Sequence, residues 1–365
     1  MSYILKRASW LELFYDLAYV ALVAQLTYLI SSNFSDPFTL ILSLIIGYTI
    51  FLAWWGTTAN RNLQDSEGLT DRIFIQIQMI IALLMSVTLF NVYESQHFWF
   101  FTLLSLIRLI QVGMMIRMRC CNPNFPFSIS RLLLVAISAM IWLSISFVPH
   151  QFILYFGIIA AFLDSIATIS SGTDGKSDVY NKAHLQERLG LFIMLVIGES
   201  MLVVAIASSV SVVGIVELFI ILSGICLMIC LWWLYFDHLE SKSSNEEPMF
   251  SPYFYGHIFL YLGIILTSAG YRNLLLDIEN LISITPLLTG GITLCAIGIF
   301  FIRIAWNGWT KHILYIFLYT LLTISLLAFI STLSNIHVYS LLIGITVILS
   351  IFTILDFYRR HFIKK

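Results

Sequence analysis

The chain has few charged residues and no catalytic signature. Only 11% of its 365 residues are Asp, Glu, Lys or Arg, whereas soluble domains carry about 25%. This shortage excludes an ordinary soluble domain, and the formal net charge of −1 gives no sign of a nucleic-acid partner. A nucleophile elbow, a P-loop, a dinucleotide fingerprint and a zinc-protease helix are all missing. We therefore expect no enzyme activity, no cofactor and no nucleic acid.

Cysteine is also scarce. The five cysteines are Cys120, Cys121, Cys226, Cys230 and Cys295. Their spacing matches neither a zinc site nor a disulfide framework, so we expect no bound metal. Cys226 and Cys230 lie one helical turn apart in an apolar run, which is typical of packing residues.

What the sequence has in excess is long apolar runs. Hydrophobic residues make up 59% of the chain, and the mean hydropathy is +0.93. A helix of about 20 apolar residues crosses a bilayer, and helices are the form that satisfies the backbone of such runs in lipid. The sequence therefore predicts an all-α polytopic membrane protein with twelve transmembrane helices. The predicted spans are 10–31, 36–56, 72–92, 97–117, 131–149, 151–170, 188–209, 212–236, 254–272, 284–303, 313–331 and 337–356.

Lysine and arginine fall almost entirely on one side of these spans. With the N-terminus inside, the outer connections carry only Arg272, and Arg108 lies within a span. Cytoplasmic loops retain basic residues, and one missed helix would invert everything after it. The pattern therefore predicts that both termini lie in the cytoplasm. The inner residues are Lys6, Arg7, Arg61, Arg72, Arg117, Arg119, Arg131, Lys176, Lys182, Arg188, Lys242, Arg303, Lys311, Arg359, Arg360, Lys364 and Lys365.

Four landmarks recur in the same order in the two halves of the chain. The matching landmarks are Glu12 with Glu187, Trp54-Trp55 with Trp232-Trp233, Arg108 with Arg303, and Asp164 with Asp356. Six spans per half is an even number, so both halves share one orientation, as in a parallel repeat. The sequence thus predicts a six-helix half at 1–170, a cytoplasmic linker at 171–187 and a second six-helix half at 188–365.

Several ionisable residues lie inside the predicted spans, where a charge costs about 2.5–3.5 kcal/mol on insertion scales. Glu199 is the clearest, because it lies in the middle of its span and follows Gly198. Arg188 lies three turns earlier on nearly the same face, so the two residues could line one path from the cytoplasm. The alternative is that Glu199 is protonated or hydrogen-bonded and only holds helices together.

Glu12 and Asp16 share one face of the first span, one turn apart. Two neighbouring carboxylates repel each other unless a proton or a cation lies between them. This pair predicts a proton or cation site at the cytoplasmic mouth. The alternative is a structural lock in which Lys6, Arg7 or Arg61 neutralises the acids.

Further candidates lie on other spans. Arg108 requires a carboxylate partner, and Asp164 and Glu199 are the buried acids available, so a structural ion pair is the favoured interpretation. Asp237-His238 closes the eighth span and His257 opens the ninth. Two histidines and an acid on facing helix ends could bind a metal or relay protons, but their spacing is no recognised metal-ligand pattern.

Four motifs resemble the low-temperature-requirement A (LtrA) family. They are Glu12-Leu13-Phe14-Tyr15-Asp16 with Gln25-Leu26, then Glu187-Arg188-Leu189-Gly190-Leu191-Phe192 with Gly198-Glu199, then Trp232-Trp233-Leu234-Tyr235-Phe236-Asp237, and finally Tyr255-Gly256-His257. Tyr15, Tyr19 and Leu189 replace phenylalanines of the family pattern. The resemblance implies a multi-pass protein of the bacterial cytoplasmic (inner) membrane associated with growth in the cold. It implies no particular chemistry, but it singles out Glu12, Asp16, Glu187, Arg188, Glu199 and Asp237.

A fainter similarity concerns the lysosomal-type potassium channels, which also contain two six-helix repeats. Their R-x-x-x-F-S-D element is kept only in part here, as Phe14-Tyr15-Asp16 in the first half and as Arg188 with Phe192 in the second. A shared fold would not establish shared selectivity.

These patterns favour a transporter of an ion or small solute in which buried acids, chiefly Glu199, bind the cargo or a coupling proton. Two alternatives stay open: a passive cation channel of the potassium type, and a lipid or envelope factor for growth at low temperature. The expected partners are the lipid bilayer and a transported ion or small molecule, and a homo-oligomer is left open.

Overall fold

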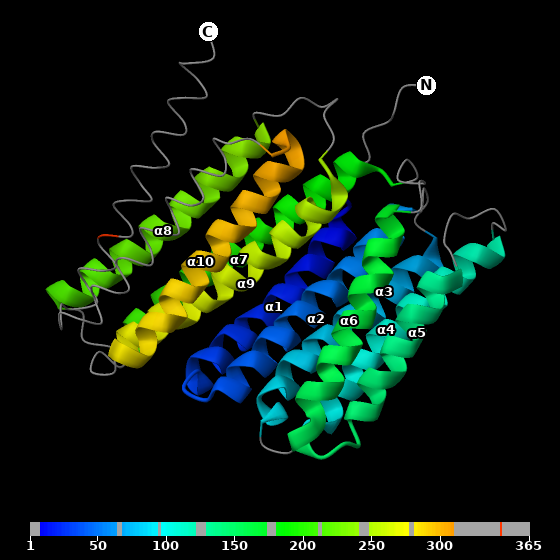
Figure 1. The fold of residues 1–365 in the computed structure, drawn as a ribbon, viewed down its shortest axis with the longest axis horizontal. Helices are drawn as coiled ribbons and strands as arrows, with labels where there is room; N and C mark the ends of the chain where they lie inside the picture. Colours follow the sequence, from blue (N-terminus) through cyan, green and yellow to red (C-terminus); the bar gives the residue numbers. More distant parts are fainter. Residues whose placement is uncertain are drawn as a thin grey trace, which may run out of the picture. The chain divides into compact units, whose positions relative to one another are not determined.

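The computed structural model describes residues 8–309 except 64–67, 94–95, 122–128, 174–179, 211–213, 241–247 and 277–280, together with Gly344. The regular structure of this part is helical throughout (Figure 1). The predicted spans 313–331 and 337–356 lie outside the described residues. The chain divides into two compact units, Met1–Phe192 and Ile193–Lys365, with the division inside helix α7.

The first unit contains six helices and the start of a seventh. They are α1 (Trp10–Asn33), α2 (Pro37–Asn62), α3 (Leu69–Thr88) continued by η1 (Leu89–Val92), α4 (Phe98–Cys121), α5 (Ile129–Ile145), η2 (His150–Phe152) with α6 (Ile153–Thr173), and α7 (Lys182–Val210). Local sequence fixes several starts. Ser9 and Glu12 form a capping box at α1, and Asp36 caps α2 with Pro37 in the first turn, which suits proline because its missing N–H needs no partner there.

Helices α1 to α6 pack as a bundle in the first unit (Figure 1). Helix α1 contacts α2 and α3, α4 contacts α2, α3 and α5, and α6 contacts α2 and α5. The interior contains large side chains that are almost wholly buried, among them Tyr15, Tyr19, Trp54 and Trp142. This arrangement places the polar residues of α1, α2, α4 and α6 inside the bundle.

The second unit contains the rest of α7, then α8 (Ile215–Glu240), α9 (Phe250–Leu276) and α10 (Leu281–Asn307). Helices α9 and α10 make the most extensive contact in this unit. A Cβ atom added to Gly263 would lie 2.5 Å from the backbone nitrogen of Cys295, and one added to Gly298 would lie 2.5 Å from that of Leu260. Both distances are shorter than van der Waals contact, so the two backbones meet at positions that only glycine can occupy.

Nine helices among the described residues are long and apolar enough to cross a membrane. They fall at nine of the predicted spans. The predicted span 131–149 coincides with α5, which has only 17 residues. Since each residue adds 1.5 Å, α5 reaches about 25 Å, less than the roughly 30 Å of a hydrocarbon core. The chain turns after Ile145, at residues 146–149, so a full crossing by α5 stays a prediction.

Candidate functional site

A buried ion pair joins α7 to α1 in the first unit. Nη2 of Arg188 donates to Oδ1 of Asp16 at 2.6 Å, and both side chains are at most 1% exposed. The same carboxylate oxygen accepts a hydrogen bond of 2.6 Å from the indole of Trp54 on α2. Three helices therefore meet at one carboxylate.

Glu12 lies one turn before Asp16 and uses one of its two oxygens. Its Oε2 accepts from the backbone N–H of Ser9 at 2.9 Å and lies 3.4 Å from Nε2 of His184 on α7. Its Oε1 is buried and has no hydrogen-bond partner among the described residues. An unsatisfied carboxylate oxygen in a membrane bundle is costly, so it identifies a place where a further group could bind.

Asn62 sets the proton position on His184. Its Oδ1 accepts from the backbone N–H of Asn181 at 2.8 Å, and its Nδ2 donates to the carbonyl of Asn181 at 2.9 Å. These two bonds orient the amide, so the Nδ2 that lies 3.1 Å from Nδ1 of His184 is a donor. Nδ1 must then accept, which leaves the proton of a neutral imidazole on Nε2, facing Glu12.

A small cavity lies beside this cluster. It has a volume of about 10 Å³ and is lined by Glu12, Tyr15, Thr57, Thr58, Arg61, Ile75 and Arg188. That volume is close to what one water molecule needs. Besides Oε1 of Glu12, buried atoms without a hydrogen-bond partner in the described part of the chain include Oγ1 of Thr58 and Nε and Nη1 of Arg188. The cavity thus combines unsatisfied acceptors and donors, as a water or proton site requires.

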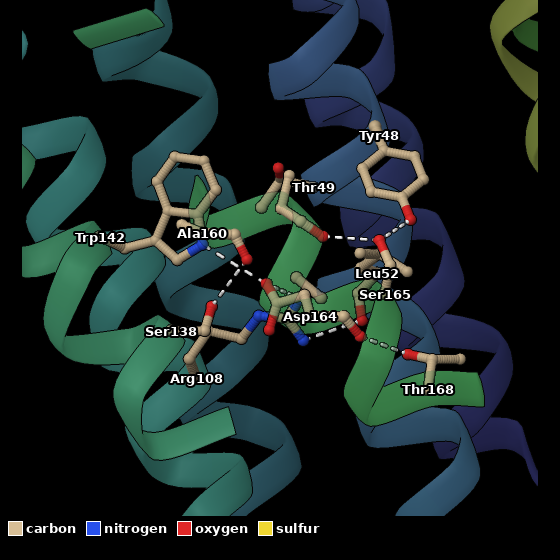
Figure 2. A network of polar contacts seen from close by, with 12 residues as sticks. Tyr48, Thr49, Leu52, Arg108, Ser138, Trp142, Ala160, Asp164, Ser165 and Thr168 are labelled. Atoms are coloured by element: carbon tan, nitrogen blue, oxygen red, sulfur yellow. Dashed lines mark hydrogen bonds and ion pairs between the residues drawn. The ribbon is translucent and has the colours of Figure 1, made fainter. Parts of the chain in front are cut away.

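A second buried ion pair lies within the same bundle (Figure 2). Nη2 of Arg108 on α4 donates to Oδ2 of Asp164 on α6 at 2.7 Å. Its Nη1 donates to the carbonyl of Leu52 and to Oε1 of Gln111, both at 3.1 Å. The indole of Trp142 on α5 lies 3.4 Å from the same Asp164 oxygen. This ion pair and its hydrogen-bond partners thus link α2, α4, α5 and α6.

Thr57 on α2 connects the two clusters. Its hydroxyl accepts from Nε2 of Gln111 at 3.0 Å and donates to Oε1 of Gln78 on α3 at 2.6 Å. Since Thr57 also lines the cavity, polar groups extend through the bundle from Glu12 to Asp164.

In the second unit, Glu199 on α7 is 8% exposed, and its Oε2 is buried with no hydrogen-bond partner among the described residues. Tyr261 on α9 is near enough to interact electrostatically with it. The hydroxyl of Ser268 lies 3.5 Å from the carbonyl of the next residue, Ser200. Glu199 therefore faces the interior of its unit.

The other predicted residues lie elsewhere. Glu187 is exposed, and its Oε2 accepts from the backbone N–H of Ala8 at 3.3 Å. His257 uses both ring nitrogens, at 2.8 Å from the hydroxyl of Tyr235 and 2.6 Å from the carbonyl of Tyr253. Asp237 is half-buried near the end of α8. Among the described residues, no group of three or more acidic, His or Cys side chains could hold a metal ion.

Sequence reasoning missed three members of the first cluster: Trp54, Asn62 and His184. In the sequence Trp54 stands out only as a landmark of the repeat, and His184 falls within the predicted linker. Because α7 begins at Lys182, six residues before the predicted span, His184 lies on the helix, one turn before Arg188. The four-residue spacing of His184 and Arg188, together with the acids at the start of the first span, could have indicated this cluster from the sequence.

Comparison with known proteins identifies the family. The family model of the bacterial low temperature requirement A protein (LtrA) matches residues 7–352. The chain belongs to the LtrA family. With its many apolar helices it is a multi-pass membrane protein. It is 23% identical over 287 residues to an uncharacterized protein of Rhizobium meliloti (strain 1021), covering 72% of this chain and 68% of that protein. No solved structure matches this LtrA protein.

Proposed function

We propose that this LtrA protein moves an ion or a small solute across the bacterial cytoplasmic membrane through its buried ionisable residues. The observation that carries the proposal is the cavity beside Glu12 and Arg188, where charged groups lie inside a membrane bundle with hydrogen-bonding capacity unused. Ionisable residues within membrane spans are expensive and mark ion or substrate pathways.

The proposed topology has twelve helices in two parallel six-helix repeats, with both termini in the cytoplasm. The position of lysine and arginine supports this orientation. In it, the start of α1, the end of α2 and the start of α7 lie at the cytoplasmic side. The Glu12 cavity is then a binding site that ions reach from the cytoplasm.

Glu199 is the proposed binding site of the second unit. Its buried oxygen without a hydrogen bond supports a role in binding a proton or a cationic group. It lies eleven residues after Arg188 on the same helix, about 16 Å along the axis at 1.5 Å per residue.

Ion flux in proteoliposomes tests this proposal. Purified protein is reconstituted, and potassium, sodium and proton gradients are imposed in turn. The wild type is compared with Glu199→Gln and Asp16→Asn, and with Glu240→Gln as a matched control, because Glu240 is an exposed carboxylate at the end of α8. We expect flux from the wild type and the control and loss of flux in the two buried variants.

The same experiment separates the alternatives. Conductance that follows any cation gradient without coupling would indicate a passive channel. An absence of flux under every gradient, from protein shown to be folded, would contradict transport of these ions. Measuring membrane lipid composition with and without the protein would then test the lipid or envelope role.

A further inference from the structure

We propose that the ion exchanged at the Glu12 cavity is a proton, that Glu12 carries it, and that metal cations are kept out. This inference rests on the proposed transport function and names the ion for one of its sites. It goes beyond the sequence pattern, which leaves a proton and a cation equally open for Glu12 and Asp16.

The lining of the cavity disfavours metal cations. Arg61 and Arg188 both border it, and Glu12 is the one carboxylate among the lining residues. A guanidinium group stays protonated in proteins, so a sodium or potassium ion would meet two fixed positive charges. A volume of about 10 Å³ leaves room for about one water molecule and none for a hydrated ion. A proton requires neither a coordination shell nor additional space.

Glu12 has the geometry of a proton carrier. Its Oε2 is held by Ser9 and His184, while its unsatisfied Oε1 belongs to a residue that lines the cavity. A water in the cavity can accept hydrogen bonds from Oγ1 of Thr58 and Nη1 of Arg188, whose donors are unused. That water can then exchange a proton with Oε1. When a hydronium ion gives its proton to Glu12, one O–H bond breaks on the water and one forms on the carboxyl group. The reverse step regenerates the carboxylate.

Proton exchange at Glu12 changes the electrostatic attraction between the surrounding helices. Glu12 and Asp16 on α1 lie beside His184 and Arg188 on α7, and Arg61 and Tyr15 also border the cavity. Helix α3 contributes only Ile75 to the lining. Protonation of Glu12 removes one negative charge from the cluster. The attraction between α1 and the start of α7 falls with each proton bound, which couples proton binding to the contact between these helices.

Infrared difference spectroscopy tests the exchange without requiring transport. Reconstituted protein is subjected to a pH jump, and the carbonyl stretch of protonated carboxylic acids is recorded. We expect a band in the wild type and in Glu240→Gln that is missing in Glu12→Gln. Glu12→Asp keeps a carboxyl group and should show a shifted band, which guards against misfolding of the amide variant. An unchanged band in folded Glu12→Gln would overturn the role of Glu12.

Flux measurements test the choice of ion. Vesicles containing a pH-sensitive dye are given a proton gradient in equal potassium and sodium on both sides. We expect proton flux in the wild type, lowered about tenfold or more in Glu12→Gln, a loss equivalent to at least about 1.4 kcal/mol. Sodium or potassium flux that is independent of pH and equal in Glu12→Gln would overturn the inference and leave transport intact. If none of these ions moves, the proposed transport of these ions fails, and the infrared band still decides whether Glu12 exchanges protons.

Discussion

Two buried arginine–aspartate pairs lie in the first unit, and their surroundings differ more than their geometry does. The Arg188–Asp16 distance is 2.6 Å and the Arg108–Asp164 distance is 2.7 Å, with all four side chains at most 4% exposed. Arg108 and Asp164 are surrounded by neutral partners, namely Leu52, Gln111 and Trp142. Arg188 and Asp16 have Glu12, a histidine and a cavity beside them.

Burial and pairing alone therefore do not show that an ionisable residue is functional. A pair enclosed by neutral donors and acceptors fixes the positions of its helices. Both pairs leave buried atoms without a hydrogen-bond partner among the described residues. A second acid and a cavity set the Arg188–Asp16 pair apart, because a proton or another group can bind there. We therefore assign the Arg108–Asp164 pair to stability and the Arg188–Asp16 cluster to function, and the following experiments test this contrast.

The largest effect is expected for Asp164→Leu. Removing one partner of a buried pair leaves an uncompensated charge, which costs about 3–5 kcal/mol. Arg108 would then lie inside the bundle with only neutral partners. Unfolding in detergent by denaturant or heat measures the loss.

The double variant Arg108→Met with Asp164→Leu is the control. An apolar pair of similar volume often restores stability, so most of the loss should be recovered and flux per folded molecule should persist. Lost flux in a stable double variant would contradict the structural assignment of this pair.

Asp16→Asn should give a smaller loss of stability and a larger loss of function. The amide oxygen can still accept from Trp54, and Glu12 still faces Arg188, so we expect about 1.5–3 kcal/mol, the contribution of a charged hydrogen bond. Flux per folded molecule should fall about tenfold or more. Stability and flux measured on the same preparation decide this, and normal flux would remove Asp16 from the site.

Asn62→Leu should act through His184. Losing the donor to Nδ1 removes the contact that fixes which ring nitrogen carries the proton, and the bonds to Asn181 are lost as well. We expect about 1 kcal/mol or more of destabilisation. Nε2 of His184 lies 3.4 Å from Oε2 of Glu12, so a change in the tautomer or orientation of the ring should shift the pH midpoint of the Glu12 infrared band. An unmoved midpoint would show that His184 does not influence Glu12.

The smallest effect is expected for Glu187→Gln. Although Glu187 is adjacent to Arg188 in sequence, it is exposed, and its hydrogen bond within the described part of the chain is one of 3.3 Å from the backbone N–H of Ala8. Surface substitutions of this kind stay within about 0.5 kcal/mol. Flux equal to that of the wild type would separate Glu187 from the working cluster, whereas a clear loss would return it to the site.

The helices could be predicted from the sequence because long apolar runs leave the backbone little choice in a bilayer. Asp164 as the partner of Arg108 was also within reach, since few buried acids were available. The joining of Asp16 to Arg188 was not, because 172 residues separate them and periodicity says nothing about which helices meet.

His184 shows a second limit. The predicted start of the seventh span followed hydropathy, whereas the helix begins at Lys182, where Asn181 accepts from the backbone N–H of His184 at 3.1 Å. Such caps extend helices into polar sequence, and hydropathy alone cannot detect them. His184 is therefore placed on α7 by a polar cap, which hydropathy does not reveal.

The seam between α9 and α10 has a mechanical consequence. Gly256, Gly263 and Gly270 recur every seven residues on α9, and Gly291 and Gly298 do so on α10. A slide of one helix along the other would bring side chains against backbone until the glycines matched again, seven residues or about 10.5 Å further on. Small sliding steps of one helix along the other are thus blocked. We expect α9 and α10 to move as one rigid body in any conformational change, with the hinges outside this pair.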